Sequence, residues 1–225
     1  MGQKTSALWH DLLHKPGTER EYKFVINDVE YGKNAEVSHS VESQLFEAFG
    51  IGNACCATLK LAVVADNIPR GATINRYLRL VNGTQATAWI PKGTFFTNKR
   101  SRDGDYWEIE AYDAMRKADV VWEPAQSLTF PMSMPTAVNL FCQMMGVKLD
   151  KRTVLNSAYT IDYPANDYTI RNELCFIAAA HGGNWIMTDE GNLLLVPLLS
   201  MPEETNYLIT EHGDAITFGG VRILV

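Results

Sequence analysis

The chain has 225 residues, and its 46% apolar share and formal net charge of −6 are ordinary for a globular protein. A chain of this length buries roughly 70% of its unfolded surface and predicts one large domain or two small ones. The acidic balance disfavours wrapping of nucleic acid, which needs clustered Lys and Arg, but it is compatible with a pore that DNA crosses. The start lacks the apolar run of a signal peptide, and no stretch approaches the roughly 20 apolar residues that span a bilayer.

The N-terminal half predicts an antiparallel β structure after one short helix. Alternation is clearest at residues 58–64, where Leu59, Leu61 and Val63 share one face while Lys60 lies on the other. Asn-Gly at positions 82–83 predicts a type I′ turn with positive φ at both residues. The expected elements are a helix at 6–14, strands at 21–26, 29–31, 58–64, 73–81, 84–90, 94–99 and 106–111, and a short helix at 113–118. Residues 43–49 fit a helical turn without a clear assignment.

After residue 112 the pattern changes to mixed helix and strand. Thr136 predicts the N-cap of a helix at 137–145 that ends at Gly146. Thr169 begins a second helix with an apolar face at Ile170, Leu174, Ile177, Ala178 and His181, widened by Cys175, Phe176 and Ala179. Residues 185–188 and 193–197 then predict a hairpin.

We therefore expect an α+β fold in three parts. Residues 1–122 form an antiparallel β-barrel or sandwich of tube-like type, and residues 123–204 form a small α+β domain. Residues 205–225 read as the opening strands of a further β domain. Because the sequence stops on an apolar strand, we expect it to be the first part of a longer protein.

No constellation in the sequence predicts catalysis, a metal site or a cofactor. His10 and His14 share a helical face but have no third ligand nearby, so they are interpreted as surface histidines. His181-Gly182-Gly183 occurs without a nucleophile elbow in the sequence, which favours a histidine at a helix C-terminus. The four cysteines include no CxxC pair and are interpreted as reduced, buried thiols of a protein made in a reducing cytosol.

Two charged clusters lie between residues 92 and 110. The acidic cluster sits in a turn and along one strand face, which favours solvated carboxylates over a catalytic pair or a calcium loop. The basic cluster lies beside two phenylalanines, which favours a charged sheet face or a subunit contact over nucleic-acid binding. The acidic cluster is Asp103, Asp105, Glu108 and Glu110, and the basic one is Lys92, Lys99, Arg100 and Arg102.

Long hairpins without a catalytic constellation gain function by pairing with neighbours, and a closed ring removes exposed sheet edges. We therefore expect an assembly interface in the middle of the chain. Its predicted residues are Trp89, Lys92, Phe95, Phe96, Arg100 and Trp107. The alternative is a carbohydrate-binding module, for which Trp89, Trp107, Trp185, Tyr106 and Tyr112 would supply stacking platforms. A cell-wall hydrolase is a third, weaker alternative.

One pattern of sheet and turn residues runs through nearly the whole chain. It comprises Glu21-Tyr22-Lys23, Ile51-Gly52-Asn53, Ile68-Pro69-Arg70-Gly71, Trp89-Ile90-Pro91-Lys92-Gly93, Glu110-Ala111-Tyr112-Asp113 and Gly183-Asn184-Trp185. This pattern resembles the N-terminal region of tail-tip proteins, the baseplate hub or tail-associated proteins of phages and prophages of Gram-positive hosts. It includes no catalytic signature.

The resemblance implies a structural role. In that family a trimeric hub closes the end of the tail tube, and two related β domains per subunit form a pseudo-sixfold ring with a smaller domain between them in sequence. The implied partners are further copies of the chain, the tail tube, distal tail and other tail-tip proteins, with DNA only passing through a lumen. The implied location is the virion tail tip, after synthesis in the bacterial cytoplasm and without membrane insertion by this region. Peptidoglycan-cleaving modules of the family lie downstream.

Overall fold

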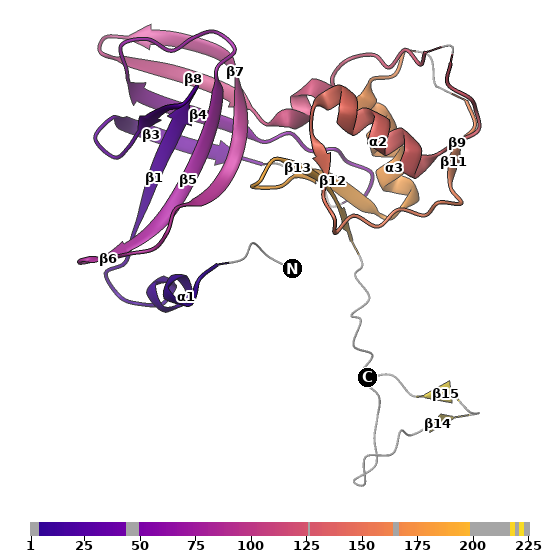
Figure 1. The fold of residues 1–225 in the computed structure, drawn as a ribbon, viewed down its shortest axis with the longest axis horizontal. Coiled ribbons are helices and arrows are strands. Elements are labelled where there is room, and N and C mark those ends of the chain that lie inside the picture. Colours follow the sequence, from indigo (N-terminus) through magenta and orange to yellow (C-terminus); the bar gives the residue numbers. More distant parts are fainter. Residues whose placement is uncertain are drawn as a thin grey trace.

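The computed structural model describes residues 5–43, 50–125, 127–163 and 167–198, together with two short paired strands, Thr217–Phe218 (β14) and Val221–Arg222 (β15). The unassigned segment 43–49 lies almost entirely outside the described residues, and so does most of the predicted third part at 205–225. The described chain has an α+β fold, with a large antiparallel sheet followed by a smaller helical region (Figure 1).

The first region, called here the sheet unit, is one antiparallel sheet with the strand order β2-β1-β5-β7-β8-β4-β3 and β6 paired to β5. Its strands are β1 (Glu19–Ile26), β2 (Val29–Tyr31), β3 (Glu36–Glu42), β4 (Thr58–Val64), β5 (Thr73–Asn82), β6 (Gln85–Ala86), β7 (Ile90–Asp103) and β8 (Tyr106–Tyr112). A short helix, α1 (Ala7–Leu13), precedes it and places Trp9 and Leu12 against Leu80 of β5.

The long strand β7 folds this sheet into two layers. Its first half pairs with β5 and its second half with β8, and register shifts occur at Asn75/Tyr77 and at Thr97/Lys99. Such bulges bend a strand and increase its twist, so β7 passes from one layer to the other. The core between the layers consists of Phe24, Ile26, Leu59, Leu61, Val63, Ala65, Ile68, Ala72, Ile74, Phe95, Ile109 and Ala111.

The expected closed, tube-like barrel is not present in the described residues. The outer strands β2 and β3 have no backbone pairing with each other, although a tight turn with a Glu36 N–H to Gly32 carbonyl bond connects them. The sandwich alternative fits in part, because one sheet supplies both layers.

The type I′ turn lies at a different hairpin from the predicted one. Asn27–Asp28 joins β1 to β2 with positive φ at both residues, 45° and 69°. At the predicted site, Asn82 pairs with Gln85, so the central residues are Gly83–Thr84 and only Gly83 has positive φ. Asn82 remains in the strand because its amide donates to the Pro16 carbonyl and the Thr18 hydroxyl.

Two strand expectations also need correction. The predicted strand at 84–90 is broken, because pairing with β5 stops after Ala86 and resumes at Ile90. In between, the buried Thr87 hydroxyl accepts a bond from the Leu80 N–H. Strand β3 was not predicted, since serine and charged residues dominate its sequence and mask its period-two alternation.

The second region, called here the helical unit, surrounds helices α2 (Met134–Met145) and α3 (Ile170–Ala180). Its strands are β9 (Met132–Ser133), β10 (Lys148–Leu149), β11 (Thr160–Ile161), β12 (Gly183–Met187) and β13 (Asn192–Pro197). The predicted hairpin is confirmed as β12–β13, and β10 pairs with β13 in parallel. A 3₁₀ turn, η1 (Ala114–Ala118), which confirms the predicted short helix, leads from the sheet unit into this core.

The helix caps agree with the sequence at α3 and differ at α2. Thr169 caps α3 in a reciprocal arrangement with Asn172, as the capping-box pattern requires. Helix α2 begins three residues earlier than predicted, with Ser133 as N-cap and Pro135 in the first turn, where a missing N–H costs nothing. The apolar face of α3 is narrower than predicted, because Phe176 is 51% exposed.

The core of the helical unit also contains residues that precede position 122 in the sequence. Ala54 pairs in parallel with Trp185 of β12, and Trp185 N–H donates to the Asn53 carbonyl. Ala54, Met115 and Ala118 are all buried in this core. The expected domain boundary near residue 122 stays a prediction, and the segment before β4 already belongs to the second core.

Candidate functional site

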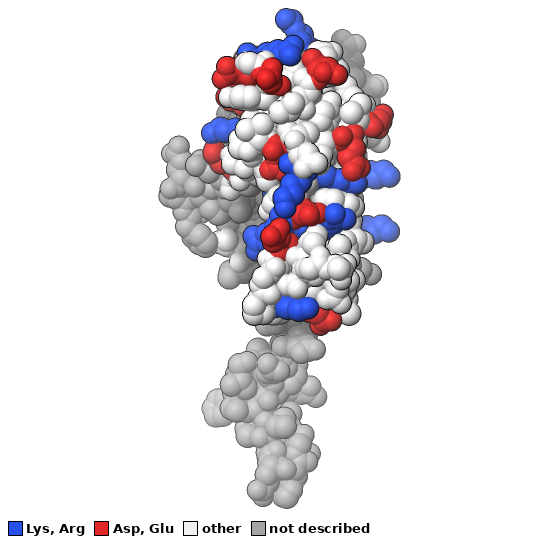
Figure 2. All heavy atoms as spheres, turned by 90° about the vertical axis from the view of Figure 1, so that its left-hand side faces the viewer, with Lys and Arg blue, Asp and Glu red and all other residues white. Residues whose placement is uncertain are grey.

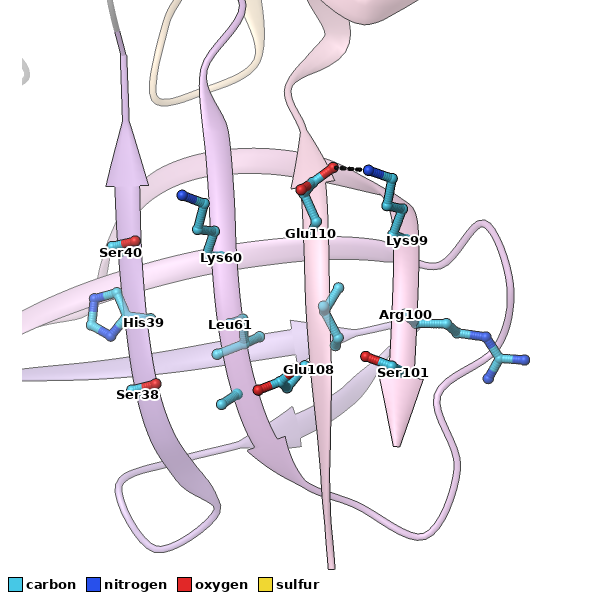
Figure 3. A pocket seen from close by; sticks show the side chains of 12 residues that line it. Ser38, His39, Ser40, Lys60, Leu61, Lys99, Arg100, Ser101, Glu108 and Glu110 are labelled. Carbon is cyan, nitrogen blue, oxygen red and sulfur yellow. Dashed lines mark ion pairs between the residues drawn. The ribbon is translucent and has the colours of Figure 1, made fainter. Parts of the chain in front are cut away.

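A groove of about 580 Å³ lies over strands β3, β4, β8 and the second half of β7. Figure 3 shows these four strands side by side, with strands of the other layer crossing behind them. Residues that point outward from the four strands are called here the outer polar face. They are Ser38, Ser40, Lys60, Ala62, Lys99, Ser101, Glu108 and Glu110.

Strand register arranges the outer polar face in two rows. One row runs across Ser40, Lys60, Glu110 and Lys99, which are direct or adjacent cross-strand partners. The next row runs across Ser38, Ala62, Glu108 and Ser101. Leu61 and Ile109 alternate with these positions and are buried, so the apolar side of each strand lines the core and the polar side faces out.

Ion pairs and hydrogen bonds balance the charge on this face. Lys60 lies 3.1 Å from Glu42, and Lys99 lies 3.6 Å from Glu110. The Tyr112 hydroxyl donates to Glu110 at 2.9 Å and lowers the pKa of that carboxyl. Glu110 is therefore ionised at neutral pH and is unsuited to act as a general acid, which needs a raised pKa.

The wider surface of the sheet unit has the same mixed character. Figure 2 views its outer end and shows acidic and basic side chains interspersed, without a large area of one sign. Within the described residues, no group of three or more His, Cys, Asp and Glu is placed to hold a metal. This face presents matched charges, small hydroxyls and a flat backbone, which suits contact with another protein surface more than bond-making chemistry.

Aromatic rings on the sheet unit are covered by cations from the same chain. The Arg79 guanidinium lies 4.5 Å from the centre of the Trp89 ring, and Lys23 Nζ lies 5.0 Å from it. Arg100 covers Trp107 at 4.9 Å. Cation–π contacts of this kind favour an aromatic ring held against its own sheet.

The rings proposed as sugar platforms are therefore already engaged. Trp185 is fully buried, and its Nε1 donates to the Leu174 carbonyl. The Tyr106 hydroxyl donates to Asp103, which raises the pKa of Tyr106. A sugar stacks on an open aromatic face, and these five rings offer little such area.

The predicted interface residues do not form one patch. Phe95 is 3% exposed and belongs to the sheet core, so its ring is not available to a partner. Lys92 and the half-buried Phe96 lie where β7 meets the helical unit, and Lys117 covers the Phe96 ring at 4.0 Å. Trp89 lies beside the start of β7, whereas Arg100 and Trp107 lie toward the β7–β8 turn, where Arg100 donates to the Ile68 carbonyl.

The two units meet at the turn between β12 and β13. Lys92 Nζ lies 2.7 Å from Asp189 Oδ2, and the Gly93 N–H donates to the Asp189 carbonyl. Gly93 has a φ of 112°, and a Cβ there would lie 2.7 Å from the Phe95 ring. Glycine is therefore required at position 93 for this close approach.

A buried carboxylate forms a second link at the same junction. Asp113 accepts from the Ala57 N–H at one oxygen and from the Met115 N–H at the other. Burial raises the pKa of Asp113. The side chain thus joins the start of β4 to the start of η1, and its hydrogen bonds account for its position inside the protein.

The contacts of the histidines and cysteines fit a role in the fold more than a role in catalysis. His10 is exposed and contacts the Thr5 hydroxyl. His181 follows α3, confirming its predicted position, with Nδ1 against the Ile177 carbonyl and Nε2 accepting from the Asn156 N–H. The four cysteines, all within the described residues, form no disulfide. Burial raises the pKa of Cys142 to about 11 and that of Cys56 to about 12, which leaves both thiols weakly nucleophilic.

Sequence reasoning named only part of the outer polar face. Lys99, Glu108 and Glu110 were recognised as charged residues of a sheet, but Ser38 and Ser40 were missed together with strand β3. Alternation of Val37, His39 and Val41 with those serines is a signal that could have found them.

No protein-family model matches the sequence, and a search of curated proteins finds no match. Solved structures do match. The 43 kDa tail protein of prophage MuSo2 from Shewanella oneidensis superposes with a TM-score of 0.54 and 12% identity, covering 78% of this chain and 54% of that one. The tail protein from Neisseria meningitidis MC58 gives 0.50 and 13%, covering 78% and 51%.

A chain in the half-lidded PdpA–VgrG complex of Francisella also matches, with a TM-score of 0.50 and 9% identity over 86% of this chain and 35% of that one. At these identities the likeness is one of fold. The chain thus has a fold found in prophage tail proteins and in a VgrG complex, and it spans about half the length of the two tail proteins. No helix in the described ranges is long and apolar enough to cross a bilayer.

Proposed function

We propose that this chain is a structural part of a phage or phage-like tail and acts in the baseplate hub at the tail tip. The observation that carries the proposal is the shared fold with the Shewanella prophage tail protein over 78% of this chain. The full-length protein assembles as a trimeric ring at the end of the tail tube, and DNA passes through its lumen. A Gram-positive host and contacts with distal tail proteins belong to the same proposal.

The outer polar face supports an assembly role. It is broad, its charges are matched, and it belongs to the part of the sheet unit that leaves strand β3 at an edge. An edge strand invites pairing with another chain unless it is covered, and cyclic assembly covers such edges. We infer that the neighbouring subunit packs against this face, and that Lys60 and Lys99 lie within the contact.

The chemistry of the groove supports a structural role more than a catalytic one. Glu110 has a lowered pKa, and Lys99 and the Tyr112 hydroxyl both contact it. The covered Trp89 and Trp107 rings argue against the carbohydrate-binding alternative. A glycan array that shows clear binding, lost on Trp89→Ala, would restore that alternative.

Native mass spectrometry of the full-length protein tests the assembly directly. We expect a trimer for the wild type. A double variant, Lys60→Glu with Lys99→Glu, places like charges in the contact and is expected to weaken association by at least about tenfold. Lys151→Glu is the matched control, since Lys151 is an exposed lysine of the helical unit.

Three results distinguish the parts of the proposal. A wild-type protein that remains monomeric at the highest attainable concentration overturns the ring. A trimer that the double variant leaves intact keeps the ring and removes the outer polar face from its interface. A loss of trimer in the Lys151→Glu control would place the interface on the helical unit instead.

A further inference from the structure

The two layers of the sheet unit are joined differently on their two sides. On one side β7 runs through both layers, so the peptide chain itself connects them. On the other side β3 pairs with β4 and has no backbone pairing with β1 or β2 in the described residues. The turn after β2 links β3 to the opposing layer at one end, and side chains hold the rest of β3 against that layer.

His39 is the centre of that contact. Its ring lies edge-on to Tyr22 and Phe24 of β1, with centroid distances of 4.3 and 5.2 Å. His39 Nδ1 lies 2.5 Å from Glu36 Oε1 on its own strand, and Nε2 lies 3.3 Å from Arg76 Nη2 on β5. The side chains of His39 and Glu36 are 12% and 18% exposed, so water contributes little to this network.

The hydrogen bonds define the protonation state of the ring. A guanidinium only donates, so His39 Nε2 accepts from Arg76, and Nδ1 carries the single proton and donates to Glu36. The groups that face the ring are Glu36 on β3, Arg76 on β5, and Tyr22 with Phe24 on β1. Arg76 packs over the Tyr22 ring at 4.7 Å, and burial lowers the pKa of Arg76, with Asp189 as a more distant anion.

We propose that neutral His39 is a latch that closes the β3 side of the sheet unit, and that acid releases it. A second proton on Nε2 removes the acceptor of Arg76 and leaves two cations facing each other. The same proton strengthens the pair of His39 with Glu36 within β3. The imidazole thus exchanges a contact between layers for a contact within one strand, and β3, no longer held against the opposing layer, opens more readily from its pairing with β4.

Two substitutions of His39 separate the two states. His39→Gln places an oxygen near the position of Nε2, so it accepts from Arg76 and has no ionisable group. His39→Asn places its amide near the position of Nδ1, so it donates to Glu36 and leaves Arg76 without its acceptor. The first mimics the closed latch at every pH, and the second mimics the open latch.

Hydrogen exchange of the β3 amides, corrected for intrinsic rates, measures the latch in the protein as it exists. Between about pH 7.5 and about pH 5.5, we expect the protection of wild-type β3 to fall by at least about tenfold, with little change for the central strand β8, which does not pair with β3. His39→Gln should stay protected and His39→Asn should stay unprotected at both values. His10→Gln, at an exposed histidine, should behave as wild type.

The proposal fails if His39→Gln shows the same fall as the wild type, or if wild-type protection does not change. Nitrogen NMR of the wild-type imidazole gives an independent answer should a variant not fold. A proton on Nδ1 alone at neutral pH supports the latch, and a proton on Nε2 at neutral pH overturns it. The NMR readout reports on the imidazole itself and does not depend on trimer formation, so failure of the assembly proposal would not decide this one.

Discussion

The helical unit and the sheet unit treat their large side chains in different ways. In the helical unit Trp185 and Phe141 are fully buried around α2 and α3. In the sheet unit Trp89 and Trp107 are half-buried on the surface, each beneath an arginine. The helical unit thus keeps Trp185 in its core, whereas the sheet unit keeps Trp89 and Trp107 outside its core, as part of a polar surface that a partner can contact.

Loss of the Trp185 side chain is expected to lower the free energy of unfolding more than any other change considered, and it tests this comparison directly. Trp185→Ala removes a fully buried indole and leaves the Leu174 carbonyl without its donor, so we expect a loss of about 3–5 kcal/mol in unfolding free energy. Trp107→Ala, on the half-buried surface of the sheet unit, should cost less. Urea unfolding followed by circular dichroism measures both, and an equal or larger cost at Trp107 would contradict the comparison.

Substitutions at the junction between the two units are expected to have the next largest effect on the free energy of unfolding. Gly93→Ala forces a side chain into a φ of 112° and against the Phe95 ring, so we expect a cost of about 2–4 kcal/mol. Gly104→Ala is the matched control, because Gly104 also has positive φ, 56°, but has open space around it; its expected cost is about 1–2 kcal/mol. Thermal unfolding of both variants checks the difference, and equal costs would show that the close approach to Phe95 is unimportant.

Asp113→Asn removes one of two acceptor oxygens from the junction and should cost about 1–3 kcal/mol. Because burial raises the pKa of Asp113, its contribution to stability is present below its ordinary pKa and is lost as pH rises through the raised value. The wild type should therefore lose stability with rising pH relative to the variant, and the gap between them should narrow. Urea midpoints over the acid-to-neutral range measure this gap, and a gap that widens would contradict the assignment.

The smallest expected effect lies on the surface of the helical unit. Hydrogen bonds from Arg152 lower the pKa of Asp150 to about 2. A lowered pKa gives stability that is present above the ordinary value and is lost as pH falls toward 2. Arg152→Ala should have only a small effect on the free energy of unfolding at neutral pH and should weaken the loss of stability between about pH 4 and about pH 2. Lys151→Ala is the control in the same unfolding series. If it weakens the acid loss of stability as much as Arg152→Ala does, the effect cannot be assigned to the contact of Arg152 with Asp150.

Local pattern predicted the elements whose partners are close in the chain. The β7–β8 hairpin, the capped start of α3 at Thr169 and the β12–β13 hairpin each have their turn or cap within a few residues. The folding of the sheet into two layers was not predictable in this way, because it depends on two bulges in β7, of which only the first has a residue signature, at Gly93. Likewise, the contact of Lys92 with Asp189 joins residues 97 apart, which no periodicity reveals.

The same limit applies to the candidate site. Alternation placed Lys60 on the outward side of its strand, and the acidic residues of β8 were recognised as a sheet face. Which strands lie side by side depends on long-range strand pairing. Strand β3 is part of the outer polar face only because it pairs with β4, and that pairing could not be predicted from the sequence. Phe95, which was predicted as an interface residue, lies in the sheet core, because a bulged strand changes which side chains point inward.

Amine footprinting of the full-length protein tests the central claim most directly. Lys60 and Lys99 are exposed in the structure described here, as is Lys151 of the helical unit. In the assembled protein we predict that Lys60 and Lys99 become protected from an amine-reactive label while Lys151 reacts as in the dissociated chain. Equal labelling of Lys60 and Lys99 in the assembled and dissociated protein would contradict the account.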